Sequence, residues 1–337
     1  MELLNKLISG KNLSFDEASS VMQNILKNEI SDVLKASYLI ALKAKGETPD
    51  EIAGFAQTMR DNSIKLNLAT NSFIDVCGTG GDSSGTFNIS TAVTFVAAGA
   101  GLKIAKHGNR SISSKSGSAD VLKEMGVRID LSKEETENLL DNSGIAFLFA
   151  PLYHPAMKFV ASVRRELAMK TVFNMLGPLT NPAGTKKQLI GTYNLEAANK
   201  MAEAAKYLDM EKISFICTDN RFDEVTLSGN TDVITYTANE ALTFENFSPA
   251  DFGYPQLALS DVKGGEPVEN AGILLKIFNS KSHTPHTYVA CANAALAIKT
   301  AGISDNLKEC VEIAEDAIFS GKALAKLEEL KMVNGAL

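Results

Sequence analysis

The chain has 337 residues, of which 45% are hydrophobic and 22% charged, the balance of a soluble globular protein long enough for two domains. Its formal net charge of −7 argues against nucleic acid or an acidic membrane surface as a partner. The apolar run 91–102 is too short and interrupted to span a bilayer, and residues 1–12 lack a signal-peptide pattern.

The cysteines indicate a reducing compartment. None of them forms a CxxC pair, and they lie far apart: Cys77, Cys217, Cys291 and Cys310. We therefore expect free thiols in a cytoplasmic protein, and neither disulfides nor a zinc site.

The first 65 residues contain only helical patterns. N-terminal capping residues, whose side chains accept hydrogen bonds from the first helical turn, mark three helix starts: Ser14, Ser31 and Thr48. The first and the third also have Glu three residues later, which completes a capping box. The predicted helices are 15–27, the segment between Ser31 and Gly46, and 49–64. We therefore expect a small helical domain, residues 1–68.

Short β-rich runs alternate with helical stretches after residue 71. The predicted strands are 73–77, 103–105, 145–149, 188–193, 212–217 and 233–236. The predicted helices between them are 90–100, 118–125, 132–142 and 195–208. This alternation indicates an α/β domain, residues 69–337, with a mostly parallel sheet flanked by helices. Such sheets bind ligands in the loops beyond the carboxyl ends of their strands.

A glycine-rich stretch, 78–91 (GTGGDSSGTFNIST), follows the first predicted strand. Glycine permits left-handed backbone and close approach, so that consecutive N–H groups can surround phosphate oxygens. The helix expected to start near residue 90 adds the positive end of its dipole. The stretch lacks the Gly-Lys-Ser/Thr of a nucleotide P-loop and the third glycine of GxGxxG. We predict an anion-binding loop, with a plain glycine turn as the alternative.

A basic segment, 106–118 (KHGNRSISSKSGS), follows the second predicted strand. No Asp or Glu occurs in residues 83–119, although this stretch contains five residues that are or can become cationic: Lys103, Lys106, His107, Arg110 and Lys115. A solvated basic loop is the alternative explanation. Because both loops end neighbouring strands, we expect them to converge on one phosphate site.

Two adjacent carboxylates, Asp223 and Glu224, lie in the loop after the strand 212–217. In a loop, both can face one polyphosphate, and carboxylate oxygens are the ligands that Mg²⁺ needs. A solvated acidic pair is the alternative if no anion loop lies nearby.

A candidate for binding an aromatic carboxylate follows residues 149–157. The next helix has an apolar stripe, and Arg164 lies at its edge, where a guanidinium can bind a carboxylate through two hydrogen bonds. Arg165 is the expected solvent-exposed neighbour. Residues 170–182 (KTVFNMLGPLTNP) are predicted to form a turn stiffened by Pro and Gly, into which the preceding helix does not continue.

Together these segments resemble, in order and over nearly the full chain, the anthranilate phosphoribosyltransferase family of tryptophan biosynthesis. The matching motifs are DVCGTGGD (75–82), TFNIST (86–91), KHGNRSISS (106–114), GSADVL (117–122), FAPLYHPAM (149–157), TVFNMLGPLTNP (171–182) and DE (223–224). Pyrimidine nucleoside phosphorylases share the fold and a glycine-rich phosphate loop but lack the KHGNR, HPAM and FNMLGPLTNP set.

The resemblance implies a homodimer of chains with a small helical and a large α/β domain, in which a segment near 155–185 returns to the small domain. It also implies Mg²⁺-dependent transfer of 5-phosphoribose from 5-phosphoribosyl 1-diphosphate (PRPP) to the nitrogen of anthranilate, with two metal ions per site.

The resemblance further implies residue roles. PRPP would be bound by Gly78, Gly81, Asp82, Thr86, Asn88, Ile89, Ser90, Thr91, Lys106, His107, Gly108, Asn109, Arg110, Ser111, Ile112, Ser113, Ser114 and Ser118. Anthranilate would be bound by Gly78, Asn109 and Arg164, with His107, His154 and Pro178 along its approach. The metal would be held by Ser90, Asp223 and Glu224. No clear general base is implied.

The sequence departs from the family in three places. Ala168 and Lys170 replace the glycine and arginine of the family's LGxRT segment, and NRF (220–222) replaces a glycine-richer sequence. Two alternatives to the transferase remain at this point: an enzyme like a pyrimidine nucleoside phosphorylase, and a non-catalytic sensor of a phosphorylated sugar.

Overall fold

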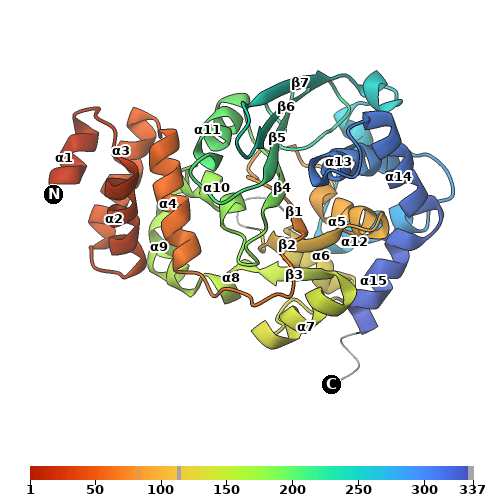
Figure 1. The fold of residues 1–337 in the computed structure, drawn as a ribbon, viewed down its shortest axis with the longest axis horizontal. Coiled ribbons are helices and arrows are strands. Elements are labelled where there is room, and N and C mark those ends of the chain that lie inside the picture. Colours follow the sequence, from red (N-terminus) through yellow and green to blue (C-terminus); the bar gives the residue numbers. More distant parts are fainter. Residues whose placement is uncertain (83, 112–114, 333–337) are drawn as a thin grey trace.

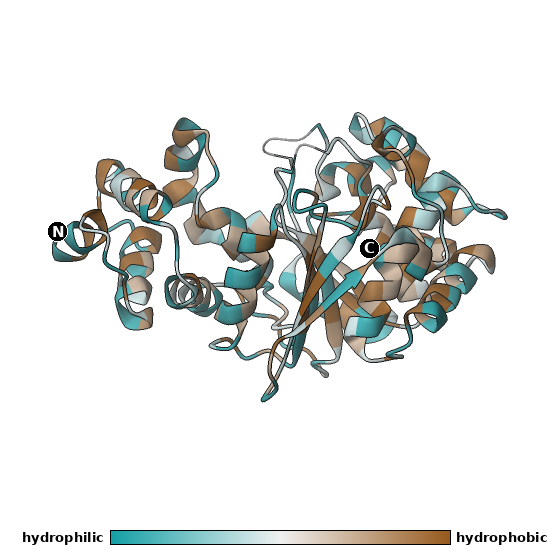
Figure 2. Cartoon of the chain, turned by 90° about the horizontal axis from the view of Figure 1, so that it is seen from above, coloured by the Kyte–Doolittle hydropathy of each residue, from teal (hydrophilic) through white to brown (hydrophobic). Residues whose placement is uncertain are grey.

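The computed structural model describes residues 1–82, 84–111 and 115–332. A small lobe of N-terminal helices lies beside a larger lobe built around a sheet (Figure 1). Seen from above in Figure 2, the strands cross the middle of the molecule, with helices on both sides of them.

The small lobe contains four N-terminal helices, of which the last three start at capping residues. The four helices are α1 (Glu2–Ile8), α2 (Phe15–Leu26), α3 (Asp32–Lys45) and α4 (Pro49–Asp61). Ser14 Oγ accepts the Glu17 N–H at 3.2 Å, and the Thr48 side chain caps α4 in the same way. Helix α3 ends at Gly46 with a φ of 86°. The three predicted helices are confirmed, whereas α1 was not predicted.

A later part of the chain packs on these helices. Helix α9 (Lys158–Leu167) contacts α2 and α3, and α10 (Phe173–Leu176) contacts α4. The buried Lys35 ammonium on α3 donates to the carbonyl of Phe159 at 2.7 Å. Val160 and Phe173 belong to the same hydrophobic cluster as the apolar side chains of the N-terminal helices.

Helix α9 does not continue into residues 170–182, as predicted, but these residues contain short helical turns that were not predicted. They contain α10 and a 3-10 turn, Pro178–Thr180. The Asn174 side chain accepts the Thr171 N–H at 3.2 Å, and Phe173 is buried against the small lobe. Tertiary burial therefore stabilises a helical turn that the Gly and Pro content disfavours.

In the described part of the chain, seven strands form one sheet in the order β3-β2-β1-β4-β5-β6-β7. The strands are β1 (Phe73–Gly78), β2 (Lys103–Gly108), β3 (Ile145–Phe149), β4 (Lys187–Gly191), β5 (Lys212–Thr218), β6 (Thr231–Thr237) and β7 (Thr243–Phe247). Strands β1 to β5 pair in parallel, and β6 and β7 are antiparallel. The six predicted strands are present, and the predicted α/β class with a mostly parallel sheet is confirmed.

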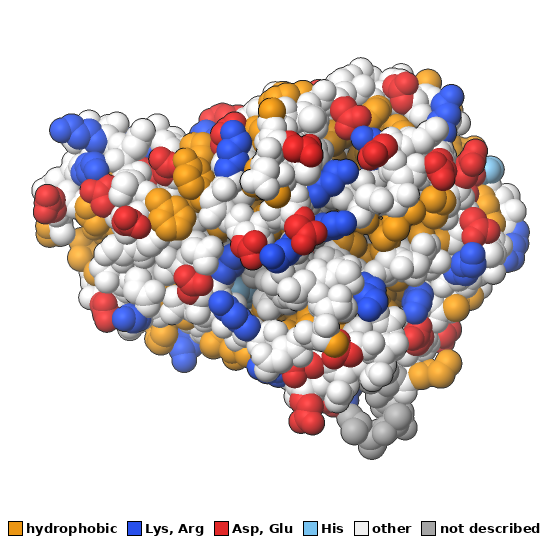
Figure 3. Space-filling view, in the orientation of Figure 1, with side chains coloured by type: hydrophobic (Ala, Val, Ile, Leu, Met, Phe, Trp, Pro, Cys, Tyr) orange, Lys and Arg blue, Asp and Glu red, His pale blue; other side chains and the backbone are white. Residues whose placement is uncertain are grey.

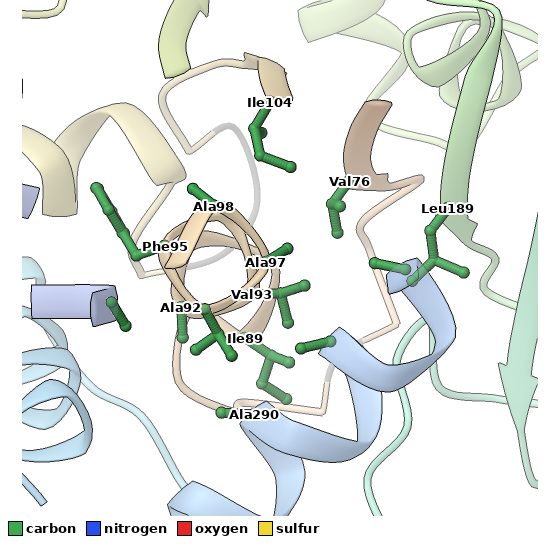
Figure 4. Packing of buried hydrophobic residues seen from close by; sticks show 14 of the residues in the cluster. Val76, Ile89, Ala92, Val93, Phe95, Ala97, Ala98, Ile104, Leu189 and Ala290 are labelled. Atoms are coloured by element: carbon green, nitrogen blue, oxygen red, sulfur yellow. The ribbon is translucent and has the colours of Figure 1, made fainter. Parts of the chain in front are cut away.

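Helices cover both faces of the sheet. Helix α11 (Leu195–Ala205) packs on β5 and β6 and also contacts α4 of the small lobe. The helices that cluster with the opposite face are α5 (Ile89–Gly99), α12 (Pro267–Phe278), α13 (Pro285–Ala301), α14 (Leu307–Phe319) and α15 (Lys322–Met332). In Figure 4, Val93 and Ala97 of α5 point toward Val76 of the sheet and toward α13. This packing places the N-terminus of α5 beside the carboxyl end of β1.

The remaining helices of the large lobe are α6 (Ser118–Glu124), α7 (Lys133–Ser143) and α8 (Ala150–Tyr153). None of the described helices combines the length and the apolar character needed to span a membrane.

Candidate active site

The loops that follow β1 and β5 meet although β4 lies between these strands. Asp223 Oδ2 accepts the Gly80 N–H at 2.7 Å. A Cβ atom on Gly78 would lie 2.7 Å from this same oxygen, and a Cβ atom on Gly191 would overlap the Asp223 backbone carbonyl. Only glycine at these two strand ends lets the acidic loop fold onto the glycine-rich loop.

The glycine-rich loop contains glycines with left-handed backbone. Gly80 and Gly81 have φ values of 65° and 75°, in the left-handed region that other residues rarely adopt. Asp82 Oδ1 accepts both the N–H and the hydroxyl of Ser84, at 3.0 and 2.9 Å, which tightens the turn. The Thr86 hydroxyl lies 3.1 Å from that of Ser84. The loop therefore holds the hydroxyl groups of Ser84 and Thr86 next to each other.

Helix α5 begins beside this loop without a side-chain cap. The Asn88 side chain instead donates to the Ser116 carbonyl at 3.2 Å and accepts from Asn270 at 2.8 Å. The Ser90 N–H donates to Glu224 Oε1 at 3.1 Å. Thr91 Oγ1 is buried and has no hydrogen-bond partner among the described residues. An acidic side chain thus occupies the positive end of the helix, where an anionic ligand is also stabilised.

The carboxylates of Asp223 and Glu224 are held in a nearly buried position. Burial, and then the nearby Asp82 carboxylate, raise the pKa of Asp223 to about 7. Burial and the adjacent Asp223 raise the pKa of Glu224 well above its usual range. Glu224 Oε2 has no hydrogen-bond partner within the described part of the chain. Buried carboxylates that repel one another favour a bound cation between them.

Side chains of the described residues do not form a complete metal site on their own. Among residues 1–82, 84–111 and 115–332, no three Asp, Glu, His or Cys side chains are grouped closely enough to hold a metal ion. A Mg²⁺ ion on one or two carboxylates takes its other ligands from water and from substrate phosphates. The donor set therefore fits a metal that arrives with a phosphorylated ligand.

Lys106 and His107 on β2 are buried, unlike the side chains of a solvated basic loop. The Lys106 ammonium is buried and donates to the Val76 carbonyl at 2.6 Å, and burial lowers its pKa. The His107 backbone N–H donates to Asp75 Oδ1 at 3.1 Å. Lys106 therefore forms a hydrogen bond to the backbone of β1 and does not present a free ammonium group to a ligand.

The His107 ring lies against that of His154, with 5.3 Å between the ring centroids. Burial, and then His154, lower the pKa of His107 to about 3. The Nε2 atom of His107 has no hydrogen-bond partner among the residues that the structure describes. His154 Nε2 lies 3.0 Å from the Thr180 carbonyl, and burial lowers its pKa too. Both rings are therefore neutral near pH 7.

The loop after β2 is braced by α6. The hydroxyl of Ser118 donates to the Asn109 carbonyl at 3.3 Å, and Asp120 accepts the Ser111 N–H at 3.1 Å. The Asn109 side chain accepts the Arg110 N–H at 2.8 Å. A Cβ atom on Gly108 would collide with Ser118, so the close contact requires glycine there. Three predicted site residues lie outside the described residues: Ile112, Ser113 and Ser114.

Arg164 has the partly buried position predicted for it. Its guanidinium carbon lies 5.0 Å from the centre of the Phe173 ring, and burial lowers its pKa. Arg165 is exposed. Helix α9 then ends at Ala168, whose φ of 45° and ψ of 33° are left-handed. Glycine adopts this left-handed conformation without strain, which explains the glycine that the LGxRT segment has at this position.

Asn293 is a residue that the sequence did not reveal. It lies on α13, is buried, and accepts the Val225 N–H at 2.9 Å while donating to the Val225 carbonyl at 2.8 Å. These paired hydrogen bonds hold the backbone directly after Glu224. A contact between residues 68 positions apart leaves no local sequence pattern.

Comparisons with known proteins agree with this geometry. The sequence matches the glycosyl transferase family a/b domain over residues 70–324 and that family's helical bundle domain over residues 1–63. The anthranilate phosphoribosyltransferase of Pelotomaculum thermopropionicum is 45% identical over 99% of this chain and 96% of its own. The chain belongs to the anthranilate phosphoribosyltransferase family.

Solved anthranilate phosphoribosyltransferases have the same fold. The enzyme from Thermus thermophilus superposes with a TM-score of 0.92 at 36% identity, over 100% of both chains. The Saccharomyces cerevisiae enzyme in complex with PRPP and Mg gives a TM-score of 0.90 at 29% identity, over 99% of this chain and 97% of the other. The prediction of an anthranilate phosphoribosyltransferase, a glycosyltransferase of tryptophan biosynthesis, is thereby confirmed.

Proposed function

We propose that the three converging loops hold PRPP with Mg²⁺, and that the edge near Arg164 holds anthranilate. The chain then transfers 5-phosphoribose to the amine of anthranilate and releases diphosphate. The observation that supports this most is the meeting of Asp223 and Glu224 with the glycine-rich loop and the N-terminus of α5. This arrangement combines an anion cradle with cation ligands at one point, as a metal-bound diphosphate requires.

The metal ligands we propose are Ser90, Asp223 and Glu224, shared between two Mg²⁺ ions. The partnerless Glu224 Oε2 and the raised pKa of Asp223 support a cation here. Bound Mg²⁺ neutralises charge on the departing diphosphate. The Saccharomyces cerevisiae relative was solved in complex with PRPP and Mg, which supports the use of Mg²⁺.

The phosphates of PRPP are assigned to the glycine-rich loop, the start of α5 and the loop after β2. The contributing residues are Gly78, Gly81, Asp82, Thr86, Asn88, Ile89, Ser90, Thr91, Lys106, His107, Gly108, Asn109, Arg110, Ser111, Ile112, Ser113, Ser114 and Ser118. Within this set Lys106 acts indirectly, because its buried ammonium donates a hydrogen bond to the Val76 carbonyl. Its positive potential supports the anion without a direct contact.

Anthranilate is assigned to Gly78, Asn109 and Arg164, with His107, His154 and Pro178 along its approach. Arg164 has donors for the carboxylate, and the neighbouring Phe173 ring provides an apolar wall. An aryl amine is neutral at pH 7, so it attacks the anomeric carbon without a strong base. A neutral His107 fits this requirement. Catalysis then depends on positioning and on electrostatic stabilisation of the leaving group.

Two structural assignments belong to this proposal. The small domain comprises residues 1–68 and is joined by the segment near 155–185, as the packing of α9 and α10 supports. The active form is a homodimer. Apolar side chains reach the surface of the small lobe (Figure 3), and two on α3 are well exposed: Val33 at 75% and Ile40 at 47%. Exposed apolar groups on one helix are suited to an interface with a second copy.

One assay tests the reaction. Protein, anthranilate, PRPP and Mg²⁺ are mixed, and the fluorescence of anthranilate is followed as it is consumed. We expect the signal to fall only when all components are present. Turnover of a nucleoside with phosphate in place of this loss would support the phosphorylase alternative, and binding of PRPP without either reaction would support the sensor.

Paired variants test the residue roles. Arg164→Ala should raise the KM for anthranilate by roughly tenfold to a hundredfold, as loss of a charge-assisted hydrogen bond does, and change the KM for PRPP little. Arg165→Ala is the matched control, because Arg165 is the exposed neighbour on the same helix. Equal effects of Arg164→Ala on both substrates would contradict the assignment.

A further inference from the structure

The side chain of Lys170 lies against the glycine-rich loop. A Cβ atom on Gly81 would lie 3.1 Å from Lys170 Cε and 3.8 Å from its Nζ, so the loop and the lysine are in contact. Lys170 is only partly exposed. It comes from the segment after α9, which is distant in sequence from the loop. A cation thus stands on the glycine-rich loop, which has no Lys or Arg of its own.

Two features of the backbone direct Lys170 to this place. Ala168 adopts the left-handed conformation that ends α9 and reverses the chain. The Thr171 N–H, on the other side of Lys170, donates to the Asn174 side chain at 3.2 Å. The backbone on either side of Lys170 is therefore fixed, so that only the Lys170 side chain can rearrange.

The Lys170 ammonium rests on an aromatic ring and not on a carboxylate. Its Nζ lies 4.1 Å from the centre of the Tyr193 ring. Tyr193 follows β4, and its N–H donates to Thr79 Oγ1 in the glycine-rich loop at 3.1 Å. No ion pair between described residues includes Lys170. A cation–π contact is weaker than a charge-assisted hydrogen bond to a phosphate oxygen, so the ammonium has a stronger partner available once a diphosphate arrives.

We propose that Lys170 binds the diphosphate group of PRPP. Its ammonium moves from the Tyr193 ring to a terminal oxygen of the diphosphate on the glycine-rich loop. Asp223 and Glu224 contact Gly80 and Ser90 directly, and as the proposed metal ligands they would hold Mg²⁺ beside the same diphosphate. The diphosphate would then be neutralised by Mg²⁺ and by Lys170 together. This assignment depends on the proposed function, in which that loop holds the leaving group.

Binding of inorganic diphosphate with Mg²⁺, measured by titration calorimetry, tests the proposal. Lys170→Gln should weaken this binding roughly tenfold, or about 1.4 kcal/mol, as expected for one lost charge-assisted contact. Lys170→Arg, which keeps the cation, should restore most of the affinity. The matched control is Lys158→Gln, because the Lys158 Nζ also rests on a ring, 4.9 Å from the centre of Phe159. Lys158→Gln should change nothing.

The outcomes separate this inference from the function that it depends on. If the wild type binds Mg²⁺-diphosphate and Lys170→Gln binds it equally well, Lys170 has no part in holding the leaving group. A raised KM for anthranilate with unchanged diphosphate affinity would also overturn the proposal and assign Lys170 to the acceptor carboxylate. Failure of the wild type to bind Mg²⁺-diphosphate would instead overturn the proposed function and this assignment with it.

Discussion

Replacing Asp223 by Asn removes one charge from the acidic pair while keeping the shape of the side chain. The Asn carbonyl can still accept the Gly80 N–H that Asp223 accepts at 2.7 Å. Burial and Asp82 raise the pKa of Asp223 from 3.8 to about 7. At 1.36 kcal/mol per pKa unit, a charged Asp223 lowers the free energy of unfolding of the metal-free chain by roughly 4 kcal/mol at most, compared with a protonated one.

The sign of the pH dependence follows from this raised pKa. The folded chain holds the Asp223 proton more tightly than the unfolded chain does. The resulting stabilisation is fully present below pH 3.8 and is lost as the pH rises through about 7. The Asn variant has no such loss. We therefore expect Asp223→Asn to be more stable than the wild type at pH 8 in EDTA, and this advantage to shrink toward pH 5.

Urea unfolding at pH 5 and pH 8, with EDTA and then with Mg²⁺, measures this difference. Mg²⁺ at ten times its dissociation constant should stabilise the wild type by about 1.4 kcal/mol and the Asn variant by less. Asp305→Asn controls for the loss of one charge, because the Asp305 side chain is 91% exposed. The reasoning is refuted if the Asn variant is no more stable at pH 8, or if its advantage is the same at both pH values.

Three further predictions follow from single residues. Asn293→Ala removes two hydrogen bonds to Val225 and should raise the Mg²⁺ concentration for half-maximal activity roughly tenfold, with the anthranilate KM unchanged; a Mg²⁺ titration checks this. Ala168→Gly should raise the free energy of unfolding by about 0.5–1 kcal/mol, because glycine adopts the left-handed φ of 45° without strain; denaturant unfolding that shows a loss would contradict this. The pKa of His107 near 3 predicts that kcat/KM shows no His107 ionisation between pH 6 and 8; a limb in that range that disappears in His107→Gln would count against it. Since this pKa is lowered from 6.5, its contribution to stability is lost as the pH falls below 6.5.

Local chemistry made much of the fold predictable. Capping residues such as Ser14 and Thr48 mark helix starts because the first N–H groups of a helix need acceptors. Alternation of strands and helices predicted the parallel part of the sheet. Helix α13 has a capped start at Thr284 and Pro285, but it is buried on nearly every side, so its apolar residues show no helical period. Strand β7 is a largely exposed edge strand and likewise lacks a clear pattern.

The candidate site was predictable where loops follow strands. The convergence of the glycine-rich loop with Asp223 and Glu224 follows from strand order, which the sequence pattern indicated only in outline. Lys106 shows the limit of that reasoning. A lysine in a glycine-rich basic segment is expected to be exposed, whereas here β1 offers it a buried carbonyl acceptor. The cation–π contact of Lys170 with Tyr193 also depends on tertiary structure alone.

The central claim is that one metal-bound PRPP joins the acidic pair to the glycine-rich loop. Diffraction from crystals grown with PRPP and Mn²⁺, recorded where Mn²⁺ scatters anomalously, tests it most directly. We expect the Mn²⁺ signal at the carboxylates of Asp223 and Glu224, with the diphosphate between them and Gly81. A signal elsewhere, or PRPP bound with these carboxylates free of metal, would contradict the account.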